Sequence, residues 1–228
     1  SFQALSTAVA AQVGTGNLAG AATALILGGP GAIFWIWVSA FFGMATIYAE
    51  ATLAQKTRIT LENGRIVGGP VYYIKACFKG KFGQVLAAIF AILITLALGF
   101  MGNMVQSNSI GNAFKEVLPS VNPLIIGAIV AVIAAVVFFG GVRRIVYFTE
   151  KVVPLMCFFY LIGGIIILIL NFSHIPQAFH DIFIGAFNPS AVVGGGVAIG
   201  IQQAIRYGVA RGLFSNEAGM GSTPHAHA

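Results

Sequence analysis

A short polar run interrupts the first apolar segment of the sequence. Gly14-Thr15-Gly16-Asn17 lies between stretches rich in alanine and leucine, and its glycines and asparagine weaken a helix. A break there frees N–H groups on the second half-helix and carbonyls on the first. The amides of Thr15 and Gly16 suit a carboxylate, because glycine lets a ligand approach closely. The carbonyls of Ala10 and Val13 suit a coupling cation.

Three side-chain amides lie in the same apolar surroundings. Asn17 is predicted either to give an oxygen to a cation or substrate, or to cap the second half-helix. Further along, Asn103 and Gln106 share a helical face with Gly99 and Ile110. Such amides are costly in an apolar helix unless they meet a polar group, and they offer donors and an acceptor without a fixed charge. Substrate binding and a hydrogen bond between helices remain the two interpretations.

The sixth apolar segment is also rich in glycine. It carries Gly194-Gly195-Gly196, then Gly200 and Gln203. At about 1.5 Å per helical residue from Ala191, the middle of the segment falls near 200–203. We therefore expect Gly196, Gly200 and Gln203 to lie near the substrate, with close helix packing as the alternative role of the glycines.

Charged and polar residues near the ends of the segments suggest a gate. Ser215-Asn216-Glu217, with Arg211 nearby, is predicted to lie at the cytoplasmic edge as an inner gate or a helix cap. Glu50 lies in the last turns of the second segment. A carboxylate at that depth indicates a gate or proton-linked group, or else a hydrogen-bonded anchor.

The composition requires a bilayer around these residues. Of the 228 residues, 58% are hydrophobic and only 8% are charged, which excludes an ordinary soluble domain. An all-α polytopic membrane protein is predicted, because about 20 apolar residues span the hydrocarbon layer. The expected spans are 4–27 (broken at 14–17), 32–55, 84–112, 124–140, 152–170 and 191–212 (broken near 194–203).

The basic residues predict the orientation. Alternating crossings place the basic residues of 56–81 and 141–151, with Arg206 and Arg211, on one face, and leave Lys115 on the other. By the positive-inside rule, both loops and the C-terminal end are cytoplasmic, in a multi-pass protein of the plasma (inner) membrane. Because topology accounts for the net charge of +6, no nucleic-acid partner is expected.

The spacing of the interrupted spans suggests an internal repeat. The first and sixth spans each open a group of five, as in transporters built from two inverted five-helix repeats that hold a substrate between broken helices. A channel would need a continuous polar path or filter, and an enzyme would need a nucleophile with its base or a metal triad. The sequence lacks these patterns, so we expect neither class, no transition-metal site and no cofactor.

Several motifs then carry a resemblance. They are Gly14-Thr15-Gly16-Asn17, Gly28-Gly29-Pro30-Gly31-Ala32, Gly69-Pro70-Val71-Tyr72-Tyr73-Ile74, Gly102-Asn103-Met104-Val105-Gln106-Ser107-Asn108-Ser109 and Gly208-Val209-Ala210-Arg211-Gly212-Leu213-Phe214-Ser215-Asn216-Glu217-Ala218-Gly219. Across its whole length the chain resembles the alanine/glycine:cation symporter family. The resemblance implies a leucine-transporter or APC-type fold and symport of a small neutral amino acid with sodium, or with protons, by alternating access. Another small-solute:cation symporter of this fold is the alternative.

Members of that family are longer than this chain. The resemblance implies that the sequence is a fragment, which carries the first repeat and the first helix of the second. The remaining helices of the second repeat are then expected to complete the site.

Overall fold

The computed structural model describes residues 2–62, 64, 66–188 and 200–227. The helices are α1 (Phe2–Gln12), α2 (Thr15–Gly28), α3 (Gly31–Thr57), α4 (Pro70–Cys77), α5 (Gly80–Leu96), α6 (Asn103–Val117), α7 (Pro123–Phe138), α8 (Gly141–Leu170), α9 (Ile175–Phe187), α10 (Ile201–Asn216) and α11 (Thr223–His227). A π-helical turn, Ala97–Gly102, joins α5 to α6, and a 3-10 turn, Phe172–His174, precedes α9. Strands β1 (Ile59–Thr60) and β2 (Ile66–Val67) form an antiparallel hairpin.

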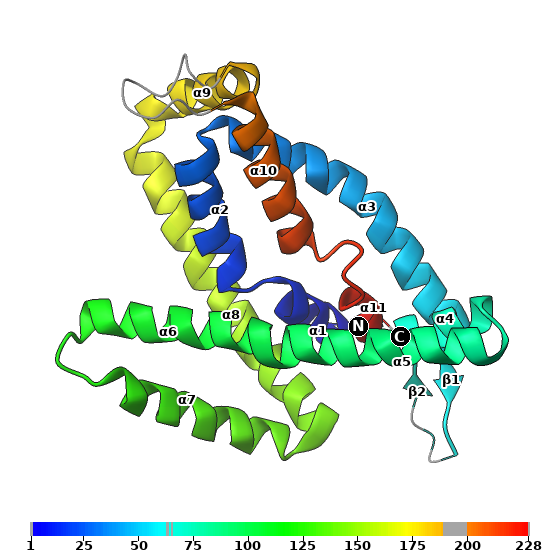
Figure 1. The fold of residues 1–228 in the computed structure, drawn as a ribbon. Coiled ribbons are helices and arrows are strands. Elements are labelled where there is room, and N and C mark those ends of the chain that lie inside the picture. Colours follow the sequence, from blue (N-terminus) through cyan, green and yellow to red (C-terminus); the bar gives the residue numbers. More distant parts are fainter. Residues whose placement is uncertain (1, 63, 65, 189–199, 228) are drawn as a thin grey trace.

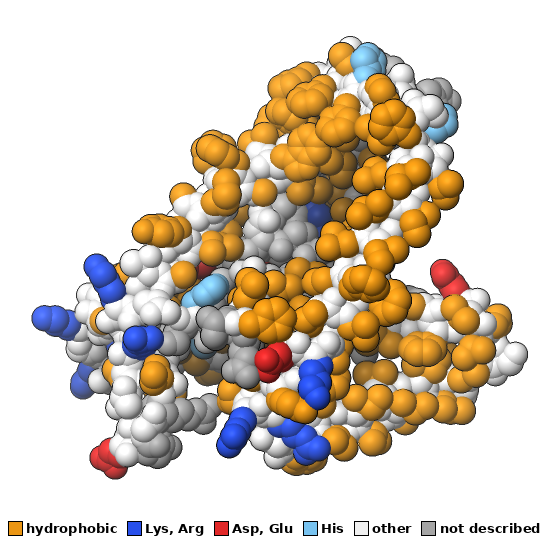
Figure 2. Space-filling model, turned by 180° about the vertical axis from the view of Figure 1, so that it is seen from behind, with side chains coloured by type: hydrophobic (Ala, Val, Ile, Leu, Met, Phe, Trp, Pro, Cys, Tyr) orange, Lys and Arg blue, Asp and Glu red, His pale blue; other side chains and the backbone are white. Residues whose placement is uncertain are grey.

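Figure 1 shows α2, α3, α8 and α10 converging on α9, while α5 and α6 form one long helix across the molecule beside α7. Both chain ends lie near α1 and α11. Among the described residues, three helices are long and apolar enough to cross a membrane: Gly31–Thr57, Gly80–Val117 and Gly141–Leu170. Hydrophobic side chains cover the long helices, and lysines and arginines gather at the lower end of the face seen in Figure 2. This surface fits an apolar solvent.

The first apolar segment is divided, as the polar run predicts. Helix α1 ends at Gln12 and α2 begins at Thr15, with Gly14 in an extended conformation between them. Four small residues of α2, Gly16, Gly20, Ala24 and Gly28, are its buried positions and recur every fourth residue. This stripe packs against α10, so packing is one role of these glycines.

Glycines also bring α10 close to α3. A Cβ atom at Gly208 would lie 2.5 Å from the carbonyl oxygen of Ala32, and one at Gly212 would lie 2.7 Å from Cβ of Ser39. The Ser39 hydroxyl donates a hydrogen bond to the carbonyl of Val209 at 3.5 Å. Helix α10 therefore packs closely against α3 through its own glycines, and against α2 through the small residues of that helix.

The segments between the expected spans contain regular structure. Residues 141–151 belong to α8, whose 30 residues exceed the roughly 20 that a span needs, so the apolar pattern alone missed its first turns. Residues 56–81 contain the end of α3, the hairpin and α4. Helix α10 starts at Ile201, next to α9. Arg206 is thus only about 8 Å along the helix from that end.

Candidate functional site

The gap between α1 and α2 is bridged by a side chain of α6. The Oε1 atom of Gln106 accepts hydrogen bonds from the Thr15 backbone N–H at 3.2 Å and from the Thr15 hydroxyl at 2.7 Å. A Cβ atom at Gly14 would overlap Nε2 of Gln106. The structure therefore brings together Thr15 and Gln106, two residues that the sequence places 91 positions apart, and the Gln106 amide packs directly against Gly14.

Asn17 spans the break from the other side. Its side-chain Nδ2 donates to the carbonyl of Gln12 at 3.1 Å, and its backbone N–H donates to the carbonyl of Gly14 at 3.0 Å. Asn17 lies inside the first turn of α2, whose N-cap is Gly14 without a side-chain cap, so it does not cap that helix. Its amide nitrogen is used, which leaves the side-chain oxygen for a cation or a substrate.

A cavity of about 360 Å³ opens at this break. Its walls come from the end of α1, the start of α2, the π-helical turn and α6, and the segment after α10. The predicted residues in its lining are Ala10, Val13, Gly16, Asn17, Gln106 and Glu217. π-helical turns in helices often accompany functional sites, and here the turn supplies Ala97, Leu98, Met101 and Gly102 to the wall.

A second interruption lies opposite the first, at the end of α10. Helix α10 stops at Asn216, Glu217 takes a left-handed conformation with φ of 55°, and α11 begins only at Thr223. Phe214, Glu217 and Met220 line the same cavity as Gly16 and Gln106. The broken part of this segment within the described residues is therefore 217–222.

Glu217 holds this interruption together. One carboxylate oxygen, Oε2, accepts hydrogen bonds from the hydroxyls of Ser222 and Thr223, the latter at 3.4 Å. Thr223 is almost fully buried, at 1% exposure. The carboxylate thus ties down the start of α11 while its residue faces the cavity.

Gln203, which was predicted to lie near the substrate, is far from the α1–α2 break. Gln203 lies beside Gly28, because a Cβ atom at Gly28 would be 3.3 Å from the Gln203 carbonyl oxygen. Gly28 is 13 residues beyond Thr15, which is roughly 20 Å along α2. Gly200 precedes α10 at that same end, and Gly196 lies outside the described residues. Counting from Ala191 starts ten residues before the described helix begins, so it shifts the midpoint toward α9.

Ser215 and Asn216 lie beside the α1–α2 break. Both line a cavity of about 850 Å³ together with Gln12, Val13 and Asn17. The Nδ2 atom of Asn216 is enclosed and has no hydrogen-bond partner in the described part of the chain. This segment therefore belongs to the surroundings of the α1–α2 break.

Asn103 is not brought to the break. Its side-chain Nδ2 donates to the carbonyl of Gly99 in its own helix at 2.9 Å. Met101, Gly102, Val105 and Gln106 line the cavity instead. The π-helical turn ends just before Asn103 and alters the register on which a regular helical face would be counted.

Glu50 anchors the segment between α10 and α11. The backbone N–H of Gly219 donates to its Oε2 atom at 3.4 Å, which is the anchoring role that the sequence left open beside gating. Tyr73 of α4 lies nearby. Burial, and secondarily the charge of Glu50, raises the pKa of the Tyr73 hydroxyl to about 12. The phenol is therefore neutral at physiological pH.

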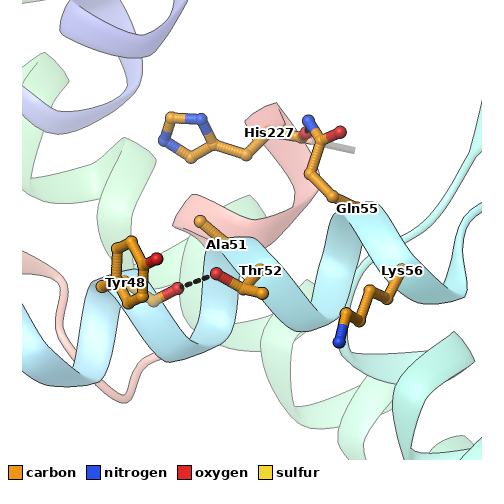
Figure 3. Close-up of a pocket in the computed structure, with 6 residues that line it drawn as sticks. All are labelled: Tyr48, Ala51, Thr52, Gln55, Lys56 and His227. Carbon is orange, nitrogen blue, oxygen red and sulfur yellow. Dashed lines mark hydrogen bonds between the residues drawn. The ribbon is translucent and has the colours of Figure 1, made fainter.

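A groove continues from the break along α3. The 850 Å³ cavity shares Tyr48, Ala51 and His227 with a cavity of about 380 Å³ that reaches Lys56. Figure 3 shows these side chains along one stretch of α3, with His227 of α11 facing them and the Thr52 hydroxyl bonded to the Tyr48 carbonyl at 2.7 Å. The smaller cavity has no residue from the α1–α2 break, so it is the far end of the groove.

Sequence reasoning missed several cavity residues. Phe214, in the last turn of α10, and Met220, in the second interruption, line the cavity at the α1–α2 break. Cys157 and Tyr160 of α8 line a cavity of about 430 Å³ with Thr15 and Gln106. A cysteine and aromatics in apolar helices resemble packing residues, and only the crossing of α8 beside α1 brings them to the site.

Comparison with known proteins identifies the family of the chain that forms this site. The whole chain, residues 1–228, matches the model of the "Sodium:alanine symporter family". It is 50% identical over its full length to "Sodium/alanine symporter AgcS" of Methanococcus maripaludis. In Bacillus subtilis, it is 42% identical over its full length to "Amino-acid carrier protein AlsT" and 40% identical over 99% of its length to "Putative sodium/proton-dependent alanine carrier protein YrbD".

The chain spans about half the length of these curated relatives, namely 49%, 47% and 45% of them in the same order. The match covers both interruptions, Gln106 and the segment after α10. It confirms the resemblance drawn from the motifs. The chain belongs to the sodium:alanine symporter family.

Proposed function

We propose that the whole protein, to which this chain contributes, carries a small neutral amino acid, alanine foremost, across the plasma membrane together with sodium or a proton. The observation that carries the proposal is the meeting of two helix interruptions, at 13–14 and 217–222, around one cavity with Gln106. Freed amides there suit a carboxylate, and freed carbonyls suit a cation. Members of the family are transporters and not enzymes.

The substrate and cation take different sides of the break in this proposal. The Thr15 and Gly16 amides and the Gln106 side chain serve the amino acid, whose carboxylate replaces Gln106 Oε1 as the acceptor of the Thr15 N–H. Carbonyls of Ala10 and Val13, with the Asn17 side-chain oxygen, serve the cation, because these residues share the cavity wall. The names of two relatives, with sodium in one and sodium or proton in the other, support both cations as candidates.

The arrangement in the membrane follows the same reasoning. A leucine-transporter-like 5+5 inverted repeat accounts for two interrupted helices that face each other, and further helices of the second repeat then close the cavity. The face that carries the hairpin and α4 is cytoplasmic, because Lys56, Lys75, Lys79 and Lys81 lie there. Ser215, Asn216, Glu217 and Glu50 form an inner gate, which opens the groove along α3.

Accumulation of alanine should depend on a cation gradient. In proteoliposomes of the whole protein, we expect uptake of labelled alanine above the external concentration only with an inward sodium or proton gradient. Ionophores that collapse each gradient separately identify the coupling ion. Accumulation that persists with both gradients collapsed would contradict symport, and glycine as a second labelled substrate measures the breadth of the site.

The role of Glu217 in uptake should depend on its hydrogen-bond acceptor oxygen more than on its negative charge. Glu217→Gln keeps an oxygen for Ser222 and Thr223, so we expect alanine uptake within about threefold of wild type, whereas Glu217→Ala should lose roughly tenfold or more. The measurement is initial uptake rate against sodium concentration. A Glu217→Gln protein with normal expression and a strongly weakened sodium dependence would show instead that the charge binds the cation.

A further inference from the structure

Arg211 is a cation that the site described above leaves without a role. It lies on α10, and its guanidinium crosses to the glycine face of α2. A Cβ atom at Gly20 would overlap the guanidinium carbon, and one at Gly16 would lie 3.2 Å from the terminal nitrogen Nη2. The side chain thus rests on the first two turns of α2, at a place that only residues without a Cβ atom leave open.

This guanidinium has no anionic partner within the described residues. Its Nε atom is enclosed and has no hydrogen-bond partner. The two carboxylates near the interruptions are occupied elsewhere, Glu217 by hydroxyls of the following segment and Glu50 by the Gly219 amide. Arg211 is half-buried, and an enclosed N–H group without an acceptor is costly, so this arrangement points to an anion that reaches the guanidinium.

The neighbours of Arg211 indicate where that anion comes from. The guanidinium lies over the Phe214 ring at 4.9 Å from its centroid, which holds one of its faces by a cation–π contact. Phe214 and Gly16 both line the 360 Å³ cavity at the break. Nη2 therefore lies next to Gly16, which belongs to the first turn of α2 and lines the cavity. The helix dipole also favours negative charge at that turn.

We propose that Arg211 recognises the carboxylate of the transported amino acid, as a partner of the Thr15 and Gly16 amides. A guanidinium offers two parallel N–H donors, which match the two oxygens of a carboxylate. Gly20 leaves the space that the guanidinium occupies, and the Phe214 ring orients the plane of the guanidinium. The inference rests on the proposed function, because it names the group that fixes the carboxylate end of the substrate.

The test compares ligands with and without a carboxylate. In proteoliposomes of the whole protein, unlabelled alanine and alaninamide compete with labelled alanine for uptake by wild type, Arg211→Gln and Arg211→Lys. We expect Arg211→Gln to raise the inhibition constant of alanine roughly 10- to 100-fold and to leave that of alaninamide nearly unchanged. Arg211→Lys keeps the charge but loses the two parallel N–H donors. Its inhibition constant for alanine should lie between those of wild type and Arg211→Gln.

Matched controls separate recognition from folding. Arg206→Gln removes an exposed arginine from the same helix and should leave both constants unchanged. Gly20→Ala should mimic Arg211→Gln by displacing the guanidinium, whereas Gly163→Ala, where a Cβ atom meets nothing within 4 Å, should not. Thermal unfolding of each purified variant shows whether it is folded.

Other outcomes would overturn the inference. If both inhibition constants shift by the same factor, or if only the maximal rate falls, Arg211 pairs with a carboxylate of the protein or merely packs. Wild-type protein that accumulates no alanine under either gradient would overturn the proposed function together with the inference. Alanine accumulation with an unchanged alanine-to-alaninamide ratio in Arg211→Gln would overturn the inference alone.

Discussion

Replacing Gln106 by leucine is expected to reduce alanine uptake by about 10- to 100-fold, because two donors at the break then lose their acceptor. The Oε1 atom accepts from the Thr15 N–H at 3.2 Å and from the Thr15 hydroxyl at 2.7 Å. Each such hydrogen bond contributes about 0.5–1.5 kcal/mol, and both donors belong to the turn proposed to receive the substrate. Initial uptake rates in proteoliposomes, normalised to protein content, measure the effect.

A second substitution at this position distinguishes support from recognition. Gln106→Glu keeps an oxygen acceptor for Thr15 but adds a negative charge next to the proposed carboxylate position. We expect it to be as inactive as the leucine variant, because like charges at this distance repel. Ser109→Ala is the control on α6, since the Ser109 hydroxyl bonds the carbonyl of Val105 in its own helix. Normal uptake by Gln106→Glu would mean that Gln106 only supports the break.

Substitution of Gly208 should affect stability more than any other replacement of a glycine on α10 by alanine. The added Cβ atom would lie 2.5 Å from both the Ala32 carbonyl oxygen and Cβ of Trp35. Backbone and a Cβ atom cannot rotate away, so α10 must move from α3. We expect Gly208→Ala to cost about 1–3 kcal/mol of unfolding free energy, seen as a midpoint lower by about 5 °C in a thermal unfolding scan of the purified protein.

The control for this prediction is a glycine with free space around it. A Cβ atom added at Gly127 of α7 would meet nothing within 4 Å, and alanine favours helix by up to about 1 kcal/mol over glycine. Gly127→Ala should therefore be neutral or slightly stabilising. Equal midpoints for Gly208→Ala and Gly127→Ala would contradict the close packing of α10 against α3.

Local composition was sufficient to place the first interruption. The polar run at 14–17 predicted a break, and α1 ends at Gln12 with α2 starting at Thr15. Two glycines and an asparagine disfavour helix regardless of their neighbours, so this part needed no tertiary information. Gln106 was predicted either to bind substrate or to form a hydrogen bond between helices, because an isolated amide in an apolar helix requires a polar partner.

Counting along the chain failed where helices do not start at the edge of an apolar run. The sixth segment was placed from Ala191, but the described helix runs over Ile201–Asn216. Gln203 therefore lies beside Gly28, and Glu217 faces the break. Asn103 failed for a related reason, because a π-helical turn precedes it and its amide bonds within its own helix.

The sequence by itself determined that this protein belongs in a lipid bilayer, which family it belongs to, and where one helix is broken. Those properties follow from composition and from local backbone preferences, which neighbouring residues in the chain fix. Only the tertiary structure decided that the second interruption is 217–222, that it meets the first around one cavity, and that the guanidinium of Arg211 lies on the glycine face of α2. These facts depend on how helices cross, and crossing is set by contacts between residues far apart in sequence, such as Gly20 with Arg211, that no local pattern encodes.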